Sequence, residues 1–125
     1  FNQTEGGVQY QGIEVGWLPE GYELVRSRTT DATILHYYVK ATDTAEQRIE
    51  VQILKFDGAG IFKVDTEADQ VYQVSVQNTL ATVIERNGCV QITWMYPKSN
   101  YIVMLCSDSI STETALRIAQ SIVLP

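Results

Sequence analysis

The fold is decided by TLATVIER-NG-CVQITWMY-PKSN-YIVMLCS, which spans residues 79–107. Asn-Gly between two runs rich in β-branched and aromatic residues specifies a two-residue type I′ hairpin, because both turn residues accept a positive φ. The segment PKSN at residues 97–100 turns the chain a second time. The stretch therefore predicts three consecutive antiparallel strands, at residues 79–86, 89–96 and 101–107.

The Asn-Gly turn also determines which side chains share a face of the sheet. Val83 is expected opposite Ile92, and Ala81 opposite Trp94, on a face that we interpret as the core. The other face carries too many large apolar side chains for a freely solvated surface: Leu80, Ile84, Met95, Ile102 and Met104. We expect something to cover part of that face.

A closing helix is predicted over residues 111–123. Ser111 is a suitable N-cap, Glu113 places a negative charge in the first turn, and apolar residues recur at helical spacing. One helix shields only one face of a sheet. Either the sheet curls on itself, or an apolar strip made of the five residues above remains as a binding face for a partner or ligand.

Upstream, period-two alternation and β-rich composition predict strands at residues 23–28, 34–41, 49–53 and 72–76. Residues 61–70 are expected to form a loop with a short helical turn. The sequence thus predicts an α+β fold: a curled antiparallel β-sheet of about six to seven strands packed by one C-terminal α-helix. We expect one domain over residues 1–125, with a polar N-terminal segment at 1–16, strands within 17–107 and the helix at 111–123.

Charge and hydropathy exclude several function classes. The net charge of -6 comes from 15 acidic and 9 basic side chains, and no stretch clusters Lys and Arg, so nucleic-acid binding is not expected. No apolar run approaches the roughly 18 residues that cross a bilayer, so no membrane insertion is expected. The chain begins at Phe1 without an initiator Met, which fits a mature product trimmed of an upstream segment, although a trimmed cytosolic protein would look the same.

No catalytic constellation is recognisable. The only histidine, His36, lies in an apolar strand sequence, where a packed histidine is more common than a catalytic one, and no nucleophile motif surrounds any serine. Asp65, Glu67 and Asp69 alternate as calcium ligands do, but the glycine and the bidentate glutamate of an EF-hand loop are missing. The sequence therefore predicts no catalytic residue, no metal site and no cofactor.

The two cysteines, Cys89 and Cys106, fall on adjacent predicted strands and on the same face. A four-residue loop at 97–100 would place Cys89 opposite Asp108, two positions out of register with Cys106. A tighter turn would set the two thiols opposite each other, close enough for a cross-strand disulfide. We expect free, largely buried thiols.

The order of short motifs resembles domain of unknown function family 4367. The resemblance rests on Trp17-Leu18-Pro19-Glu20-Gly21-Tyr22, on VQITW at residues 90–94, on YIVML at 101–105 and on the closing helix. It spans nearly the whole chain. This family has no assigned catalytic residues, so Trp17, Pro19, Gly21, Tyr22, Trp94 and Tyr101 match as framework positions. Asn78 stands where such domains often have a glycine.

The resemblance implies a bacterial domain, mostly from Gram-positive species, that is commonly outside the membrane behind a signal or transmembrane segment. Some relatives are joined to regions that resemble anti-sigma factors. We therefore expect a non-enzymatic extracytoplasmic module for binding, sensing or regulation, whose partner is an unknown protein or small ligand. The alternatives are an enzyme with an unrecognised site, for example a pocket that brings His36 against two carboxylates, and a structural or oligomerisation domain.

Overall fold

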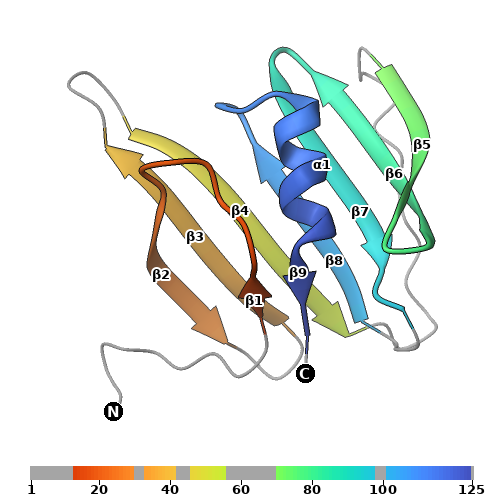
Figure 1. Cartoon of the computed structure of the whole chain (residues 1–125), viewed down its shortest axis with the longest axis horizontal. Helices are drawn as coiled ribbons and strands as arrows, with labels where there is room; N and C mark the ends of the chain where they lie inside the picture. Colours follow the sequence, from red (N-terminus) through yellow and green to blue (C-terminus); the bar gives the residue numbers. More distant parts are fainter. Residues whose placement is uncertain (1–12, 30–32, 42–45, 56–69, 98–100, 125) are drawn as a thin grey trace.

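Within the part of the chain that the structure describes, seven antiparallel strands form the main sheet. The computed structural model describes residues 13–29, 33–41, 46–55, 70–97 and 101–124. Across the sheet the order is β2-β3-β4-β8-β7-β6-β5, so β2 and β5 lie at the edges and the sheet is not closed into a barrel (Figure 1). The strand bounds are β2 Glu23–Thr29, β3 Thr33–Ala41, β4 Glu46–Lys55, β5 Gln70–Val76, β6 Thr79–Arg86, β7 Cys89–Met95 and β8 Tyr101–Ser107. The α+β class and the antiparallel sheet are confirmed.

Two meanders, β2-β3-β4 and β5-β6-β7-β8, meet in the middle of the sheet. β4 pairs with β8, with Val51 opposite Leu105 and Ile53 opposite Val103. All four of these side chains are buried. The pairing joins residues more than 45 positions apart, and short-range patterns do not predict such a contact.

The hairpins follow the predicted register. Ala81 pairs with Trp94 and Val83 with Ile92 around a turn in which Asn87 has φ 48° and Gly88 has φ 83°. The β5-β6 turn at Gln77 and Asn78 is of the same positive-φ kind.

The next loop has four residues, because the Tyr96 amide donates to the Tyr101 carbonyl at 2.9 Å and Met95 pairs with Ile102. The looser of the two alternatives for the Cys89 and Cys106 register is therefore the observed one.

The helix is shorter than predicted. α1 spans Thr112–Gln120, and the Ser111 hydroxyl accepts the Thr114 amide at 3.2 Å, as expected for an N-cap. The Ser121 hydroxyl and amide both donate to the Ile118 carbonyl, at 2.7 and 2.9 Å, and so close the last turn. Residues 121–123 were wrongly placed in the helix.

Beyond the helix, β9 (Ile122–Val123) pairs antiparallel with β1 (Glu14–Val15). The Gly16 amide donates to the Ser121 carbonyl at 3.0 Å, and a Cβ at Gly16 would lie only 3.1 Å from that oxygen. Ile13 is buried and Val15 packs against the core. The described end of the expected polar segment 1–16 therefore belongs to the core.

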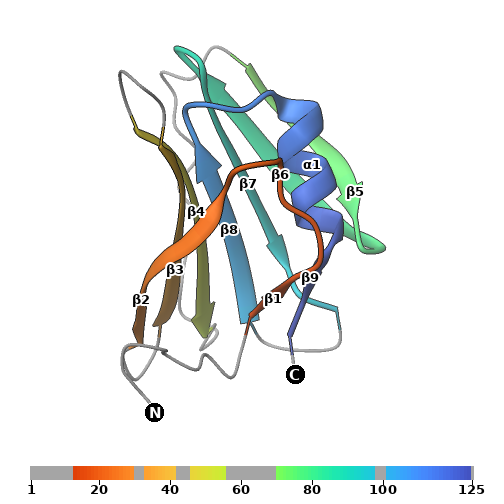
Figure 2. The same cartoon turned by 60° about the vertical axis from the view of Figure 1, so that its left-hand side comes forward.

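The core lies between the sheet and α1 with the β1-β9 pair, which cover the same face (Figure 1). α1 packs on β5, β7 and β8. Its buried residues Ala115, Ile118 and Ala119 belong to one core cluster with Trp94, Ile92 and Leu105, and Ile122 is buried in the same cluster. Figure 2 shows α1, β1 and β9 together on one side of the strongly twisted sheet.

Gln77 ties the helix to the sheet. Its side-chain amide nitrogen donates to the carbonyls of Ala119, Gln120 and Ile122, at 3.2, 3.4 and 2.6 Å. Its side-chain oxygen accepts the indole N–H of Trp94 at 3.3 Å. One turn residue thus satisfies orphan carbonyls of the helix end and the largest buried side chain of the core.

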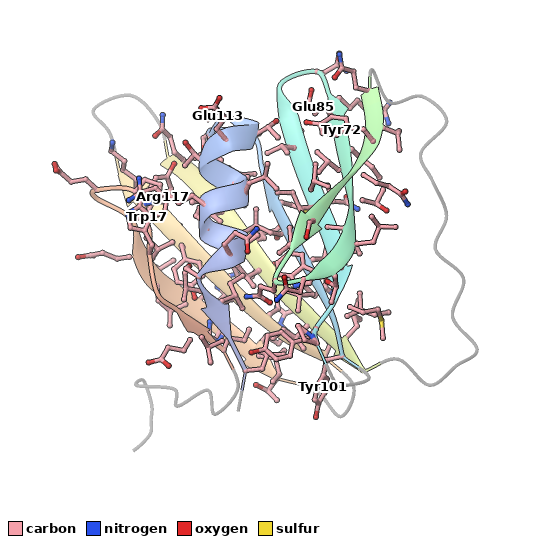
Figure 3. The ribbon with its side chains drawn as sticks, turned by 45° about the vertical axis from the view of Figure 1, so that its right-hand side comes forward. Trp17, Tyr72, Glu85, Tyr101, Glu113 and Arg117 are labelled. Atoms are coloured by element: carbon pink, nitrogen blue, oxygen red, sulfur yellow. The ribbon has the colours of Figure 1, made fainter. Side chains whose placement is uncertain are left out.

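At the other end of the helix, Glu85 makes a similar connection. The Tyr72 hydroxyl and the Thr112 hydroxyl each donate to Oε2 of Glu85 at 2.6 Å. Figure 3 shows Tyr72 and Glu85 beside the start of the helix. The hydrogen bond to the Glu85 carboxylate is the main reason that the pKa of Tyr72 is raised. We interpret this cluster as a structural tie between β5, β6 and α1.

Some predictions fall outside the described residues. These are the loop at residues 61–69 and the alternating acids Asp65, Glu67 and Asp69. Gln70, the last residue of the expected loop, is the first residue of β5.

Candidate functional site

The face of the sheet opposite α1, here called the open face, carries no helix or strand over it among the described residues. The strand register arranges its side chains in rows across the strands. All five predicted binding residues, Leu80, Ile84, Met95, Ile102 and Met104, lie on this face, because their direct neighbours in sequence on β6, β7 and β8 point into the core. Their role in binding stays a prediction.

Three of the five residues form one row. Ile102 pairs with Met95 on one side and with Leu54 of β4 on the other, and the β6-β7 register continued by one step places Leu80 next to Met95. Leu54, Ile102, Met95 and Leu80 therefore form an apolar row across four adjacent strands. Leu80 is 65% exposed, whereas Ile102, between Met95 and Leu54 in the row, is only 7% exposed.

The other two residues lie apart from this row. Met104 belongs to the next row, where it pairs with Gln52 and Thr93. Ile84 pairs with Gln91, which pairs with Cys106, nearer the Asn87-Gly88 turn. The predicted apolar strip is thus concentrated at one end of the open face, and Ile84 lies in a polar setting at the other end.

That polar end is hollowed. A cavity of about 360 Å³ is lined by residues that include Arg48, Glu50, Ile84, Arg86, Cys89 and Asp108. A second cavity, also of about 360 Å³, is lined by Val25, Arg26, Tyr37, Val39, Arg48 and Glu50. Arg48 and Glu50 line both, so the two cavities adjoin at these side chains and together extend across the strands from β2 to β6. We call these two adjoining cavities the arginine groove.

Both thiols lie in the first cavity. Cys106 pairs with Gln91, so Cys89 is displaced by two positions and the two cysteines are free. Burial raises the pKa of Cys106 to about 11, and the neighbouring Glu50 carboxylate and Cys89 add to the effect. Cys89 is exposed. The expectation of free thiols is confirmed. The expectation that both thiols are largely buried is wrong for Cys89, which begins β7 beside the hairpin turn.

His36 lies on the opposite face, inside the core. It is 2% exposed, and its Nδ1 is 3.1 Å from the Tyr38 hydroxyl. Burial lowers the pKa of His36 to about 4 and raises that of Tyr38 to about 12. His36 lines neither cavity of the arginine groove.

The described residues contain no group of three or more His, Cys, Asp or Glu side chains placed to hold a metal ion. Within the same ranges, no helix has the length and apolar character needed to cross a membrane.

These features define a class of protein: a small α+β domain in which a terminal helix covers one face of an open antiparallel sheet, and no described helix or strand covers the other face. The profile of the family described as "Domain of unknown function (DUF4367)" matches residues 12–122. The chain belongs to this family. The comparisons with curated proteins and with solved structures found no match.

Sequence reasoning missed Leu54 and the arginine groove. Leu54 directly follows Ile53, so the period-two alternation of the strand places it on the outer face. Its position beside Ile102 depends on the long-range β4-β8 pairing, which the sequence does not show. The groove combines side chains of β2, β4 and β6, which only the strand order brings together.

Proposed function

We propose that this chain is a non-enzymatic binding or sensing module that acts outside the cytoplasm as part of a membrane-anchored or exported protein, and that it recognises its partner with the open face. The observation that supports the proposal most is the asymmetry of the sheet. One face is packed by α1 and the β1-β9 pair, whereas the other presents an apolar row, with Leu80 65% exposed, beside a groove.

The energetics favour a contact rather than a solvated surface. Covering an exposed leucine or methionine removes on the order of 100 Å² of apolar area from water, which corresponds to about 2 kcal/mol for a fully buried side chain. In the row, Leu80 is exposed, Leu54 and Met95 are half-buried and Ile102 is buried, so the four side chains form a compact and partly exposed apolar patch of the kind that marks interaction sites. The extracytoplasmic location is supported by membership of the family and by what the resemblance implies for its members.

No specific observation favours an enzyme. The histidine that would serve as a base is buried on the core face, and the acidic side chains that line the groove lie on the other face.

The test uses the full-length protein in the cells that produce it. A photo-crosslinking residue replaces Leu80 in the apolar row, and in a matched variant it replaces Glu113, which is exposed on α1. We expect a discrete covalent adduct from position 80, none from position 113, and loss of the adduct when Met95→Glu is added. Equal adducts from both positions, or an adduct that survives Met95→Glu, would refute the use of this face.

The location is tested separately. An epitope tag at the C-terminus of the full-length protein is expected to be digested when intact cells are treated with protease. Complete protection of the tag in intact cells, with digestion after lysis, would place the domain in the cytoplasm and contradict the proposal.

A further inference from the structure

The arginine groove has a charge pattern that differs from the rest of the chain. It is lined by Arg26, Arg48 and Arg86 from three different strands, against the carboxylates of Glu50 and Asp108. Among the described residues that line it, the groove therefore has more arginine than carboxylate, although the chain as a whole carries a net charge of -6. Basic groups gathered in a hollow of an acidic protein attract and orient an anionic ligand.

Arg48 is the centre of the groove, because it lines both cavities. Its side chain is exposed, and within the described residues neither its guanidinium nor the Glu50 carboxylate forms an ion pair. Arg26 lies over the Tyr37 ring, with its guanidinium carbon 5.8 Å from the ring centroid, so its charge is held at the surface of the second cavity. A guanidinium offers a planar pair of donors that fits a carboxylate, whereas the ammonium group of a lysine has no such planar pair.

The spacing of the arginines indicates the shape of the ligand. Neighbouring strands lie about 4.8 Å apart, so Arg26 and Arg48 are separated by about 10 Å and Arg48 and Arg86 by about 14 Å across the sheet. A small molecule is too short to meet the first and the last. An extended chain rises about 3.4 Å per residue, so about seven residues cover the same distance. The groove is also open to solvent along Arg48, Arg86 and Cys89, unlike the enclosed pockets that bury small ligands.

We propose that the arginine groove binds an extended acidic segment of a partner protein, with carboxylates on the arginines and an uncharged or basic residue opposite Glu50. Glu50 makes the site selective, because an anion with charge at every position would meet a like charge there. This inference rests on the proposed function and adds the chemistry of the partner. The segment lies across the strands at the groove end of the open face, and the apolar row contacts a different part of the partner.

The experiment selects ligands from a random heptapeptide library displayed on phage, using the 125-residue chain. We expect enrichment of peptides with two acidic residues three or four positions apart and with no acid between them at the position opposite Glu50. The consensus peptide is then titrated against the wild type, Arg48→Gln and Arg117→Gln. Arg117 is the matched control, because it lies over the Trp17 ring at 4.0 Å on the helix side (Figure 3).

Arg48→Gln is expected to weaken binding by about tenfold to one hundredfold, as for the loss of a charge-assisted hydrogen bond. Arg117→Gln is expected to leave the affinity unchanged. Bound peptide is also expected to slow alkylation of the Cys89 thiol, which lies in the first cavity. Unfolding midpoints of the variants confirm that each chain is folded.

Three results would overturn the inference. They are a library selection without acidic enrichment, a consensus affinity that Arg48→Gln leaves unchanged, and inorganic phosphate that competes with the peptide at equal concentration, which would indicate a simple anion site. If any of these occurs while crosslinking from position 80 persists, the acidic segment is refuted and the binding module stands. If crosslinking fails while the peptide binds the groove, the apolar row is refuted instead.

Discussion

Protonation of His36 is expected to destabilise the fold. The imidazole is 2% exposed, and burial lowers its pKa from 6.5 to about 4. In the unfolded chain the same group takes up a proton near pH 6.5, so between pH 6.5 and 4 the unfolded state binds more protons than the folded state. The stabilisation is therefore complete above pH 6.5 and is lost as the pH falls toward 4.

The magnitude follows from the shift. One pKa unit corresponds to about 1.4 kcal/mol, so the full change amounts to about 3 kcal/mol, of which about 2 kcal/mol is lost by pH 4.5. This is a large part of the 5 to 15 kcal/mol that stabilises an ordinary domain.

The assay compares wild type with His36→Gln in urea at 25 °C, followed by tryptophan fluorescence at pH 7.5, 6.5, 5.5 and 4.5. The variant is expected to be less stable at pH 7.5, and its deficit is expected to shrink by about 2 kcal/mol at pH 4.5. Carboxylates titrate in both proteins and so cancel in the difference. Tyr38→Phe, which keeps the imidazole, is the control and is expected to retain the pH dependence. Because the chain has one histidine, its NMR titration reports this group alone; a pKa near 6.5, or a deficit independent of pH, would refute the reasoning.

Three further predictions concern single residues. Gln77→Leu removes the partner of three carbonyls and of the Trp94 N–H, and it is expected to lower the free energy of unfolding in urea by about 2 to 4 kcal/mol. The control Gln73→Leu, at an exposed position of β5, is expected to change the free energy of unfolding by less than about 0.5 kcal/mol. Similar losses for the two variants would contradict the role of Gln77 in holding the helix to the sheet. Gly88→Ala places a Cβ at φ 83° and is expected to cost about 1 kcal/mol, while Asn78→Gly, at φ 65°, is expected to be neutral or slightly stabilising. In native protein at pH 8, a thiol reagent is expected to modify Cys89 rapidly and Cys106 only after addition of urea, because the pKa of Cys106 is raised to about 11. Equal rates of modification for the two thiols would contradict this expectation and show that the Cys106 thiol is accessible in the native protein.

Local signals predicted the second half of the molecule well. Asn87-Gly88 specified a turn that only positive φ satisfies, and the register of Val83 with Ile92 followed from it. The Ser111 cap located the start of α1. Both signals depend on neighbouring residues, so tertiary contacts had little opportunity to override them.

The rest depends on contacts between distant residues. Ile122 and Val123 continue the apolar pattern of the helix. They form a strand instead, because they pair with β1 and the Gly16 amide donates to the Ser121 carbonyl just before them. The cap of the helix end by Gln77 comes from a hairpin more than 40 residues earlier. The candidate face was predicted by strand parity, while its division into an apolar row and an arginine groove needed the β4-β8 pairing.

Among the described residues, the two meanders are joined by the β4-β8 strand pairing, and α1 packs on β5, β7 and β8 and is tied to β6 through Thr112 and Glu85. The β5-β8 half with its helix therefore holds most of its hydrogen bonds and packing within one continuous stretch of chain. The β2-β4 half depends on β8 for its inner edge. Amide protons of β2 and β3 are expected to exchange through partial openings that leave β6 and β7 protected. The β2-β4 half is thus expected to separate from β8 before the whole domain unfolds. The arginine groove spans both halves of the sheet. A partner bound across it would therefore stabilise the β4-β8 pairing and slow the exchange of the β2 and β3 amide protons.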